Sequence, residues 1–529
     1  MLKMTTRSFW GWGLEQAALA PDEIDALATR LKAQFGLPVD KPSPIPTAEG
    51  LELPASRVCP PASLTGMMSD DIRDRAGHTY GKAFRDIVRG LNGDFRRAPD
   101  LVARPASEQE LLDLLDWAAS QRLAVIPYGG GSSVVGGVEA RLDGDWAGAL
   151  SVDMARFDQV LEVDPVSRAA HLQAGLYGPA LEAALKPHGL TLRHYPQSFE
   201  FSTLGGWLAT RAGGHFATGP THIDDLVEST RLLTPSGLIE TRRLPASGAG
   251  PSPDRLLLGS EGILGFFVSA WMRLQARPEH RAGCTIAFER MKDGCKAVRQ
   301  IAQSGLYPSN CRLIDATEAV LSDIGDGTRE LLILAFESAD HPVDAWLGRA
   351  LEICRDTGGE VLENPGQTDD PAAQWRSTFL RAPYMRDALV RLGMIVETFE
   401  TAVTWDRFED THAAIVSAVQ DTARRVCGGA AVGCRFTHVY PDGPAPYYTV
   451  IAPGRPGSMI EQWDEIKLAT MEAIDRHGAT VTHHHAVGRD HRPGYDRQRP
   501  ALFARALGAV KQELDPQGVL NPGVLIDPE

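Results

Sequence analysis

Three adjacent histidines, His483, His484 and His485, follow a β-like run near the C-terminus, in the segment ATVTHHHAVGRDHRPG. Imidazole titrates near neutral pH, so such residues act as general acids or bases, bind anions or ligate metals. In a strand, His484 would point away from its two neighbours, and no acidic or cysteine ligand lies nearby in the sequence. We therefore expect acid/base chemistry or anion binding, and no metal. For an isolated match, a solvated loop would be the simpler interpretation.

A second candidate site is the glycine-rich segment AVIPYGGGSSVVGGVE, where a β-like run leads into a loop. Glycine permits positive φ and close approach of the main chain, so consecutive N–H groups can surround an anion. The segment lacks the Gly-Lys-Ser/Thr of a Walker loop and the glycine spacing of a Rossmann fingerprint. Taken alone, it is either an anion-binding loop or a turn between strands. The residues concerned are Gly129, Gly130, Gly131, Ser132, Ser133, Gly136 and Gly137.

The length and texture of the chain indicate how these motifs are positioned. A chain of 529 residues is too long for one ordinary core, so we expect two large lobes. Short apolar runs between glycine and proline turns alternate with helical patterns, which is typical of an α+β fold. We assign residues 1–95 to an N-terminal extension with helical patterns, 96–276 and 277–495 to two α+β domains, and 496–529 to a C-terminal segment.

Charge and cysteine content narrow the partners and the compartment. The net charge of −15 disfavours nucleic acid, which needs a basic surface. The seven cysteines are scattered and odd in number, which favours reduced thiols in the cytoplasm. We find no signal-peptide pattern and no apolar run of membrane-spanning length. We therefore expect a small-molecule substrate, and peripheral attachment to a membrane stays open because one amphipathic face can provide it.

Four segments follow the glycine-rich one in order: HYPQSFEFSTLGGWLATRAGG, HIDDLV, LTPSG and GSEGILG. Their order and spacing resemble the PCMH-type FAD domain of the vanillyl-alcohol oxidase and p-cresol methylhydroxylase superfamily. The resemblance implies an FAD cofactor held in a PCMH-type domain at 96–276, a cap domain for the substrate at 277–495, and a C-terminal segment that returns to the FAD domain. The implied cofactor-binding residues are Pro127, Gly129, Gly130, Gly131, Ser132, Ser133, Gly136, Pro196, Ser198, Ser202, Thr203, Gly205, Gly206, Arg211, Asp224, Asp225, Glu261, Gly262 and Gly265.

The attachment of FAD is predicted from the first loop. Many members of that superfamily bind FAD covalently through a histidine or cysteine near these loops. Here no histidine or cysteine lies between Val125 and Glu139, so we expect noncovalent FAD. His194 and His215, near the second turn, are interpreted as ordinary polar residues.

The histidine segment supports a narrower resemblance. HHHAVG resembles the HHHGVG signature of alkyldihydroxyacetone phosphate synthases, with Ala486 in place of the usual glycine. The segments FWGWG, PSNCRLID, VETFETAVTW and CRFTHVYPDGPAPYYTV resemble further motifs of that family. The resemblance places Arg312 at the family's active-site arginine and Tyr447 at its catalytic tyrosine, with Tyr448 in that role if the register differs by one residue. It also implies a lipid-like substrate, and we expect a homodimer.

The family's reaction exchanges the acyl group of acyl-dihydroxyacetone phosphate for a fatty alcohol through an adduct at flavin N5. Tyr447 would then act as acid or base, tuned by His484 and His485. Arg312 would face the phosphate or the adduct, or would form an ion pair with Asp315. Two alternatives are an FAD-dependent D-2-hydroxy acid dehydrogenase or oxidase of the lactate or glycolate type, and a flavin-binding protein without catalysis.

Overall fold

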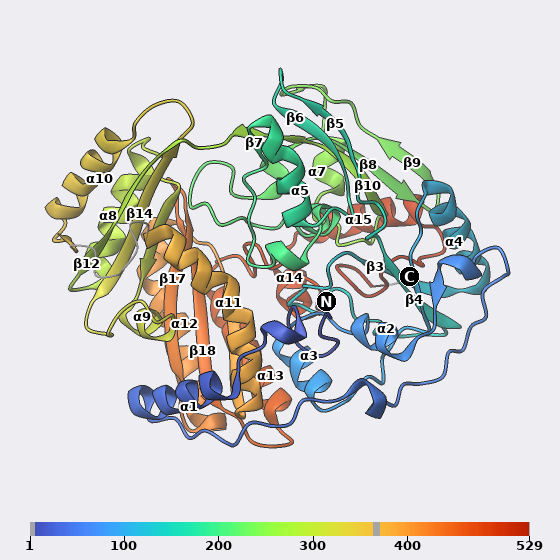
Figure 1. Ribbon diagram of the computed structural model, residues 1–529, viewed down its shortest axis with the longest axis horizontal. Coiled ribbons are helices and arrows are strands. Elements are labelled where there is room, and N and C mark those ends of the chain that lie inside the picture. The colour runs from blue at the N-terminus through green and yellow to red at the C-terminus, as the bar shows by residue number, and fades with distance from the viewer. Residues whose placement is uncertain (1–5, 363–370, 528–529) are drawn as a thin grey trace, which may run out of the picture.

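The structure of the protein, a computed structural model, describes residues 6–362 and 371–527 and has two lobes (Figure 1). The lobe on the left of the figure holds one large sheet, and the lobe on the right holds a four-stranded sheet, a five-stranded sheet and a two-stranded pair. The predicted two-lobed α+β fold with an N-terminal helical extension is confirmed. Within the described ranges, every helix is too short or too polar to span a lipid bilayer.

The first lobe places the glycine-rich loop at the end of a buried parallel strand. Its four-stranded sheet has the order β1-β2-β4-β3, in which β2, β4 and β3 are parallel. Its five-stranded antiparallel sheet has the order β5-β6-β10-β8-β9. The strands are β1 (Met68–Ser69), β2 (Leu101–Ala103), β3 (Leu123–Tyr128), β4 (Gly148–Asp153), β5 (Val160–Asp164), β6 (Ala169–Gln173), β8 (Val227–Thr234), β9 (Gly237–Glu240) and β10 (Phe266–Arg273), with a small pair β7 (Leu190–Thr191) and β11 (Gln275–Ala276).

Helices flank these sheets. Helix α4 begins after Ser107, whose hydroxyl accepts from the Glu110 amide as an N-cap, and leads into β3. Helix α6 begins at the turn of residues 202–206, which is predicted from the sequence to bind the cofactor and is called the second cofactor turn below. Thr203 caps this helix in the same way. The helices are α2 (Ile72–Gly77), α3 (Phe84–Leu91), α4 (Glu108–Gln121), α5 (Gly178–Leu185), α6 (Leu204–Thr210) and α7 (Pro253–Leu257).

The second lobe is a seven-stranded antiparallel sheet of order β15-β12-β14-β13-β17-β18-β16. Helices α8, α10 and α12 pack on one face through an apolar core that includes Val298, Ile353 and Val419. The other face looks toward the first lobe. The elements are β12 (His280–Phe288), α8 (Met291–Gln303), β13 (Asn310–Ile314), α9 (Ala316–Leu321), β14 (Glu330–Ser338), α10 (Asp344–Asp356), β15 (Glu360–Val361), α11 (Pro371–Arg391), β16 (Met394–Glu400), α12 (Trp405–Cys427), β17 (Ala431–Val439), β18 (Pro444–Pro453) and α13 (Met459–Arg476).

The N-terminal extension packs on the second lobe, although it precedes the first in sequence. Helix α1 (Pro21–Phe35) has an acidic first turn and ends at Gly36, and its Ile24, Leu27 and Leu31 pack against α11 and β16. Helix α3 likewise shares a cluster with Trp463 of α13. The extension therefore joins the two lobes.

The C-terminal segment returns to the first lobe after α14 (Arg492–Gln498) and α15 (Ala501–Leu514). Leu520 forms a parallel bridge with Val125 of β3, and Val519 and Leu520 are fully buried in that lobe's core. The buried carboxylate of Asp515 organises this return: it accepts from Lys511 Nζ at 2.5 Å, the Val519 amide at 3.1 Å and the Leu520 amide at 2.8 Å.

Substitution Asp515→Ala should destabilise the fold by about 3–5 kcal/mol, because it leaves two buried amides without their acceptor and removes the counter-charge of the Lys511 ammonium, which keeps only two carbonyls. Equilibrium urea unfolding measures this loss. The control is Glu513→Ala, which removes an exposed side chain from the same helix and should change the free energy of unfolding by less than about 0.5 kcal/mol. Equal losses for the two variants would contradict the assigned role of Asp515.

Candidate active site between the lobes

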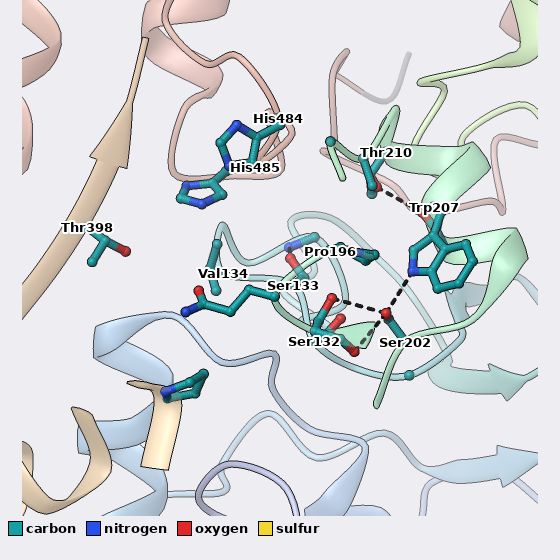
Figure 2. Close-up of a pocket in the computed structure, with 18 of the residues that line it drawn as sticks. Ser132, Ser133, Val134, Pro196, Ser202, Trp207, Thr210, Thr398, His484 and His485 are labelled. Atoms are coloured by element: carbon teal, nitrogen blue, oxygen red, sulfur yellow. Dashed lines mark hydrogen bonds between the residues drawn. The ribbon is translucent and has the colours of Figure 1, made fainter. Parts of the chain in front are cut away.

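One large cavity lies between the lobes and is lined by residues 129–134 and 137 of the glycine loop and by one face of the seven-stranded sheet. Two further turns line it, the second cofactor turn at residues 202–206 and the third cofactor turn at residues 261–262. Figure 2 shows His484 and His485 facing the loop that carries Ser132, Ser133 and Val134. Most of the residues predicted from the sequence line this cavity: Pro127, Gly129, Gly130, Gly131, Ser132, Ser133, Pro196, Ser198, Ser202, Thr203, Gly205, Gly206, Glu261, Gly262, Gly265, Arg312, Tyr447, His484 and His485.

The glycine loop has the geometry of an anion cradle. Among the described residues, the amides from Gly130 to Val134 donate no hydrogen bond to another protein group, and all five residues line the cavity. A side chain at Gly130 would collide with the carbonyl of Phe201, and Gly131 has a φ of +65°. These constraints explain the glycines, and the five available donors fit a pyrophosphate.

The second turn is held by its own side chains. Ser202 Oγ accepts from Trp207 Nε1 at 2.7 Å and is bonded to Ser198, as the dashed lines in Figure 2 show for Ser202. Thr203 Oγ1 accepts from the Gly206 amide. The hydroxyls of Ser202 and Thr203 therefore fix the backbone of a turn that itself lines the cavity.

Four predicted cofactor residues lie outside the set that lines this cavity: Gly136, Arg211, Asp224 and Asp225. Asp224 is buried and its Oδ2 accepts from Arg211 at 3.0 Å and also from Arg255. This ion pair ties the end of α6 to the segment before β8. Contacts of these four residues with a cofactor stay a prediction.

The histidine loop, residues 479–488, is not a strand, so the predicted alternation of its side chains is wrong. The amides of three consecutive histidines converge on the buried carboxylate of Glu400 at the end of β16. Glu400 Oε1 accepts from the amides of His484 at 3.1 Å and His485 at 2.8 Å, and Oε2 accepts from that of His483. Thr482 Oγ1 donates at 2.7 Å. The acidic partner that the local sequence lacked thus comes from 83 residues away.

The charge of Glu400 is stabilised by these partners. Burial alone would raise its pKa, but nearby His485 and His483 and the hydroxyl of Thr482 lower the pKa of Glu400 to about 2. A carboxylate that accepts several N–H groups keeps its charge even when it is removed from water. Glu400 is therefore an ionised anchor of the histidine loop.

A second buried carboxylate holds the other end of the histidine loop. Glu261, on the third cofactor turn, accepts from the amides of Val487 at 2.8 Å and Gly488 at 2.7 Å. Burial raises the pKa of Glu261 to about 7, although the hydrogen bonds from the two amides act to lower it. Because Glu400 belongs to the second lobe and Glu261 to the first, the loop is fixed to both.

Tyr447 faces the cavity, and Tyr448 does not. The β17–β18 register pairs Tyr447 with Arg435, whose guanidinium lies 4.0 Å from the centre of the tyrosine ring. Burial raises the pKa of Tyr447, and the positive charge of Arg435 opposes that rise. Tyr448 points to the opposite face, where its hydroxyl contacts His412 at 3.1 Å. The structure therefore favours the predicted register.

Two guanidinium groups share the wall beside Tyr447. Arg312 is 2% exposed, donates to the carbonyl of His215 at 3.4 Å, and its pKa is lowered to about 9 by burial and by Arg435. Asp315, the alternative partner considered for Arg312, instead caps α9 and accepts from the Cys434 amide. Fixed guanidinium charges in a low-dielectric wall suit an oxyanion.

Sequence reasoning missed Arg435, which pairs with the buried Glu318, and its neighbours Thr437 and His438 on β17. A register shift between Phe436 and His438 turns both Thr437 and His438 toward the cavity. Alternation from Arg435 along the strand could have indicated Thr437, whereas the shift leaves no signal in one sequence.

Arg386 of helix α11 is a further cation of the cavity wall. It donates to the Lys82 carbonyl at 2.6 Å and pairs with Asp387.

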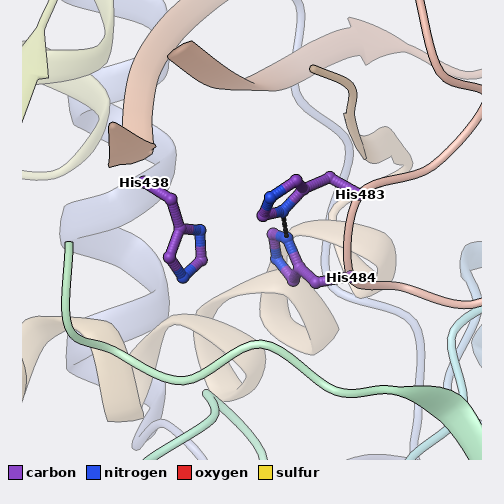
Figure 3. A group of neighbouring side chains, drawn as sticks. All are labelled: His438, His483 and His484. Atoms are coloured by element: carbon purple, nitrogen blue, oxygen red, sulfur yellow. Dashed lines mark hydrogen bonds between the residues drawn. The ribbon is translucent and has the colours of Figure 1, made fainter. Parts of the chain in front are cut away.

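The imidazoles form a cluster in which His438, His483 and His484 bring ring nitrogens within 4.8 Å of one another (Figure 3). Such a group, like Glu400 with His484 and His485, could hold a metal. Hydrogen bonds account for several of these nitrogens: His483 Nδ1 lies 3.1 Å from His484 Nδ1, and His438 Nε2 lies 3.0 Å from the Gly214 carbonyl. Absence of a metal stays a prediction.

Burial lowers the pKa of His438, His483 and His484 well below the ordinary value of histidine, so the neutral rings can accept a proton.

His483 itself does not line the cavity, and it contacts His484 through the hydrogen bond between their Nδ1 atoms. His485 lines it, with its pKa lowered by burial although Glu400 acts to raise it.

Two family descriptions match the chain: "FAD binding domain" over residues 99–242 and "FAD linked oxidases, C-terminal domain" over residues 277–525. The chain is a two-domain FAD-dependent enzyme of this class. A curated alkyldihydroxyacetonephosphate synthase from Dictyostelium discoideum is 30% identical to it over 95% of this chain and 88% of the relative. The chain belongs to the alkyldihydroxyacetonephosphate synthase family, and the predicted family and FAD cofactor are confirmed.

Solved structures agree with this assignment. A structure of alkyldihydroxyacetonephosphate synthase matches with a TM-score of 0.82 and 26% identity, covering 98% of both chains. The structure of p-cresol methylhydroxylase matches with a TM-score of 0.68 and 12% identity, covering 87% of this chain and 94% of that one, and shares the fold.

Substitution Glu400→Gln should cost about 3 kcal/mol of stability and most of the activity, because an amide cannot accept from three N–H groups and a hydroxyl at once. Urea unfolding and turnover measure the two effects. Thr482→Val is the matched control: it removes one bond to Glu400 but keeps the three amides, and should cost about 1 kcal/mol with activity retained. Full activity of Glu400→Gln would contradict the role of Glu400 as the anchor of the histidine loop.

The pKa of Glu261 predicts a pH dependence of stability. Its folded pKa of about 7 lies above its ordinary 4.5, so between these values the folded state holds more protons than the unfolded state. The free energy of unfolding should therefore fall as pH rises from about 4.5 to about 7, by up to about 3 kcal/mol. Urea titrations at pH 5 and pH 8 test this. Glu261→Gln should flatten the difference, and an unchanged slope in that variant would contradict the assignment.

Proposed function

We propose that this enzyme replaces the acyl group of acyl-dihydroxyacetone phosphate with a fatty alcohol, giving alkyl-dihydroxyacetone phosphate and a carboxylate. The observation that carries the proposal is that one cavity joins an anion cradle to a wall bearing Tyr447, two guanidinium groups and the histidine loop. Membership of the alkyldihydroxyacetonephosphate synthase family supports the same reaction.

The substrate phosphate would bind at Arg312 and Arg435. Both guanidinium groups are buried in the cavity wall, where a phosphate dianion gains more from a fixed charge than it would in water. Apolar side chains line the same cavity and would receive the hydrocarbon chain, namely Leu321, Phe379, Leu389, Val396 and Ile451. The cavity thus offers separate places for a charged head and an apolar tail.

FAD would be held by the amides of residues 130–134 and by the second and third turns, without a covalent bond. When bound and reduced, FAD supplies the nucleophilic ring nitrogen that the exchange at the substrate carbon requires. The protein must orient the ester beside it, exclude water and move the proton of the alcohol.

Tyr447 would move that proton. Its ring lies 6.1 Å from the ring of His484 and 5.4 Å from that of His485, which are centroid distances, and it stacks with His484. The neutral imidazole of His484 can take the proton, while Arg435 favours the phenolate form of Tyr447. These residues therefore serve as acid and base on the substrate side of the cavity.

The second candidate reaction is oxidation of a D-2-hydroxy acid, which the match to the FAD-linked oxidase C-terminal domain favours. In that case Arg312 would bind the carboxylate and FAD would accept the hydride. Unlike the exchange, this reaction reduces the flavin.

The test supplies the reduced protein, without oxygen, with palmitoyl-dihydroxyacetone phosphate and labelled hexadecanol, and supplies oxidised protein with D-2-hydroxy acids. Labelled ether is expected, and Tyr447→Phe should lower its formation at least about 100-fold because the acid/base hydroxyl is lost. The matched control Tyr448→Phe removes a hydroxyl from the opposite face of the sheet and should stay within about threefold.

Bleaching of the flavin by a hydroxy acid with no ether product would overturn the proposed exchange and support the oxidation.

A further inference from the structure

The proposed exchange releases a proton that must leave the cavity between the lobes. An ester and an alcohol give an ether and a carboxylic acid, and the acid is ionised at neutral pH. Each turnover therefore sends one proton, originally on the alcohol oxygen, to bulk water. The neutral imidazoles can accept it, but a proton that stayed on them would stop the next turnover.

A continuous chain of hydrogen bonds runs from the cavity to the surface. His484 Nδ1 lies 3.1 Å from His483 Nδ1, and His483 Nε2 lies 2.9 Å from Tyr440 Oη. Tyr440 Oη lies 2.9 Å from Thr221 Oγ1, which lies 3.2 Å from His222 Nδ1. All of these distances are within hydrogen-bonding range.

A backbone carbonyl sets the direction of the whole chain. His222 Nε2 lies 2.9 Å from the carbonyl of His483, which can only accept, so neutral His222 carries its proton on Nε2 and accepts at Nδ1. Thr221 must then donate to His222, and Tyr440 must donate to Thr221.

The direction of the outer hydrogen bonds also determines that of the inner ones. Since the Tyr440 hydroxyl hydrogen is used, His483 Nε2–H donates to Tyr440, and His483 Nδ1 accepts from His484 Nδ1–H. The donors of His484, His483, Tyr440 and Thr221 therefore all point toward His222, and each of these groups has one proton to hand on and one site to receive the next.

The outer end of the chain lies at the surface. His222 and Tyr440 are partly exposed and are not among the residues that line the cavity. Gly219, Pro220 and Pro441 beside them in sequence are exposed. His484, at the inner end, lines the cavity.

We propose that His484, His483, Tyr440, Thr221 and His222 form a proton exit relay, which carries the alcohol proton from the reaction site to water. In each turnover the proton enters at His484, and each donor passes its own proton to the next group until His222 receives one at Nδ1. His222 then releases its Nε2 proton to water when its hydrogen bond to the His483 carbonyl opens. No bond between heavy atoms changes, and the chain is restored when the hydroxyls reorient and the imidazole rings, whose tautomers the transfer has exchanged, flip. The inference rests on the proposed function, which supplies the proton.

The experiment compares wild type, Tyr440→Phe and Thr221→Val in dilute buffer, with FAD content and circular dichroism as checks of folding. Labelled ether and proton release, followed with a pH indicator, are measured together. Each variant breaks the chain at one hydroxyl and should turn over roughly tenfold slower. Added imidazole should restore the rate by carrying the proton, and the solvent isotope effect in D2O should be larger than in wild type. The matched control Tyr448→Phe should show none of these changes.

The relay is refuted if both variants turn over at the wild-type rate, or if they are slow to the same degree at every imidazole concentration with an unchanged isotope effect. Failure of the proposed function looks different, because wild type then makes no ether. In that case a flavin bleached by a D-2-hydroxy acid releases a hydroxyl proton at the same place. Rescue of the bleaching rate by imidazole then decides for or against the relay.

Discussion

The arrangement of the site depends on the buried carboxylate of Glu400, which gathers three consecutive histidine amides at one point. Removing a charge from water is costly, and only several well-aligned donors offset that cost. Those donors exist only when residues 482–485 bend around Glu400. The requirement therefore fixes the backbone, and with it the places of His484 and His485. Glu261 adds the same constraint from the first lobe, so the histidines are positioned relative to the cofactor side as well.

The charges in the cavity are divided between two kinds of side chain. Arg312 and Arg435 supply positive charge, while burial keeps the imidazoles neutral and able to accept protons. The antiparallel register of β17 and β18 places Arg435 beside Tyr447. A one-residue slip of β18 would place Tyr448 on the cavity face instead of Tyr447, so packing of the opposite face determines which phenol faces the cavity.

Much of the fold could be predicted because its signals are local. Helix α1 has an acidic start and a terminal glycine, and β3 leads into glycines that tolerate positive φ. The histidine loop could not be predicted, because its conformation depends on Glu400 far away in sequence, and local patterning favoured a strand. Arg435 escaped notice because a buried cation and a solvated one look alike in a single sequence.

If the proposed exchange takes place in this cavity, a phosphate-bearing ester must bind there between FAD and the wall that carries Tyr447. A crystal structure of the FAD-bound protein with a non-reactive ether analogue of acyl-dihydroxyacetone phosphate tests this binding mode most directly. We expect the phosphate oxygens of the analogue within hydrogen-bonding distance of Arg312 and Arg435, and its hydrocarbon chain along Leu389 and Val396. A phosphate bound elsewhere, with both guanidinium groups untouched, would contradict this binding mode.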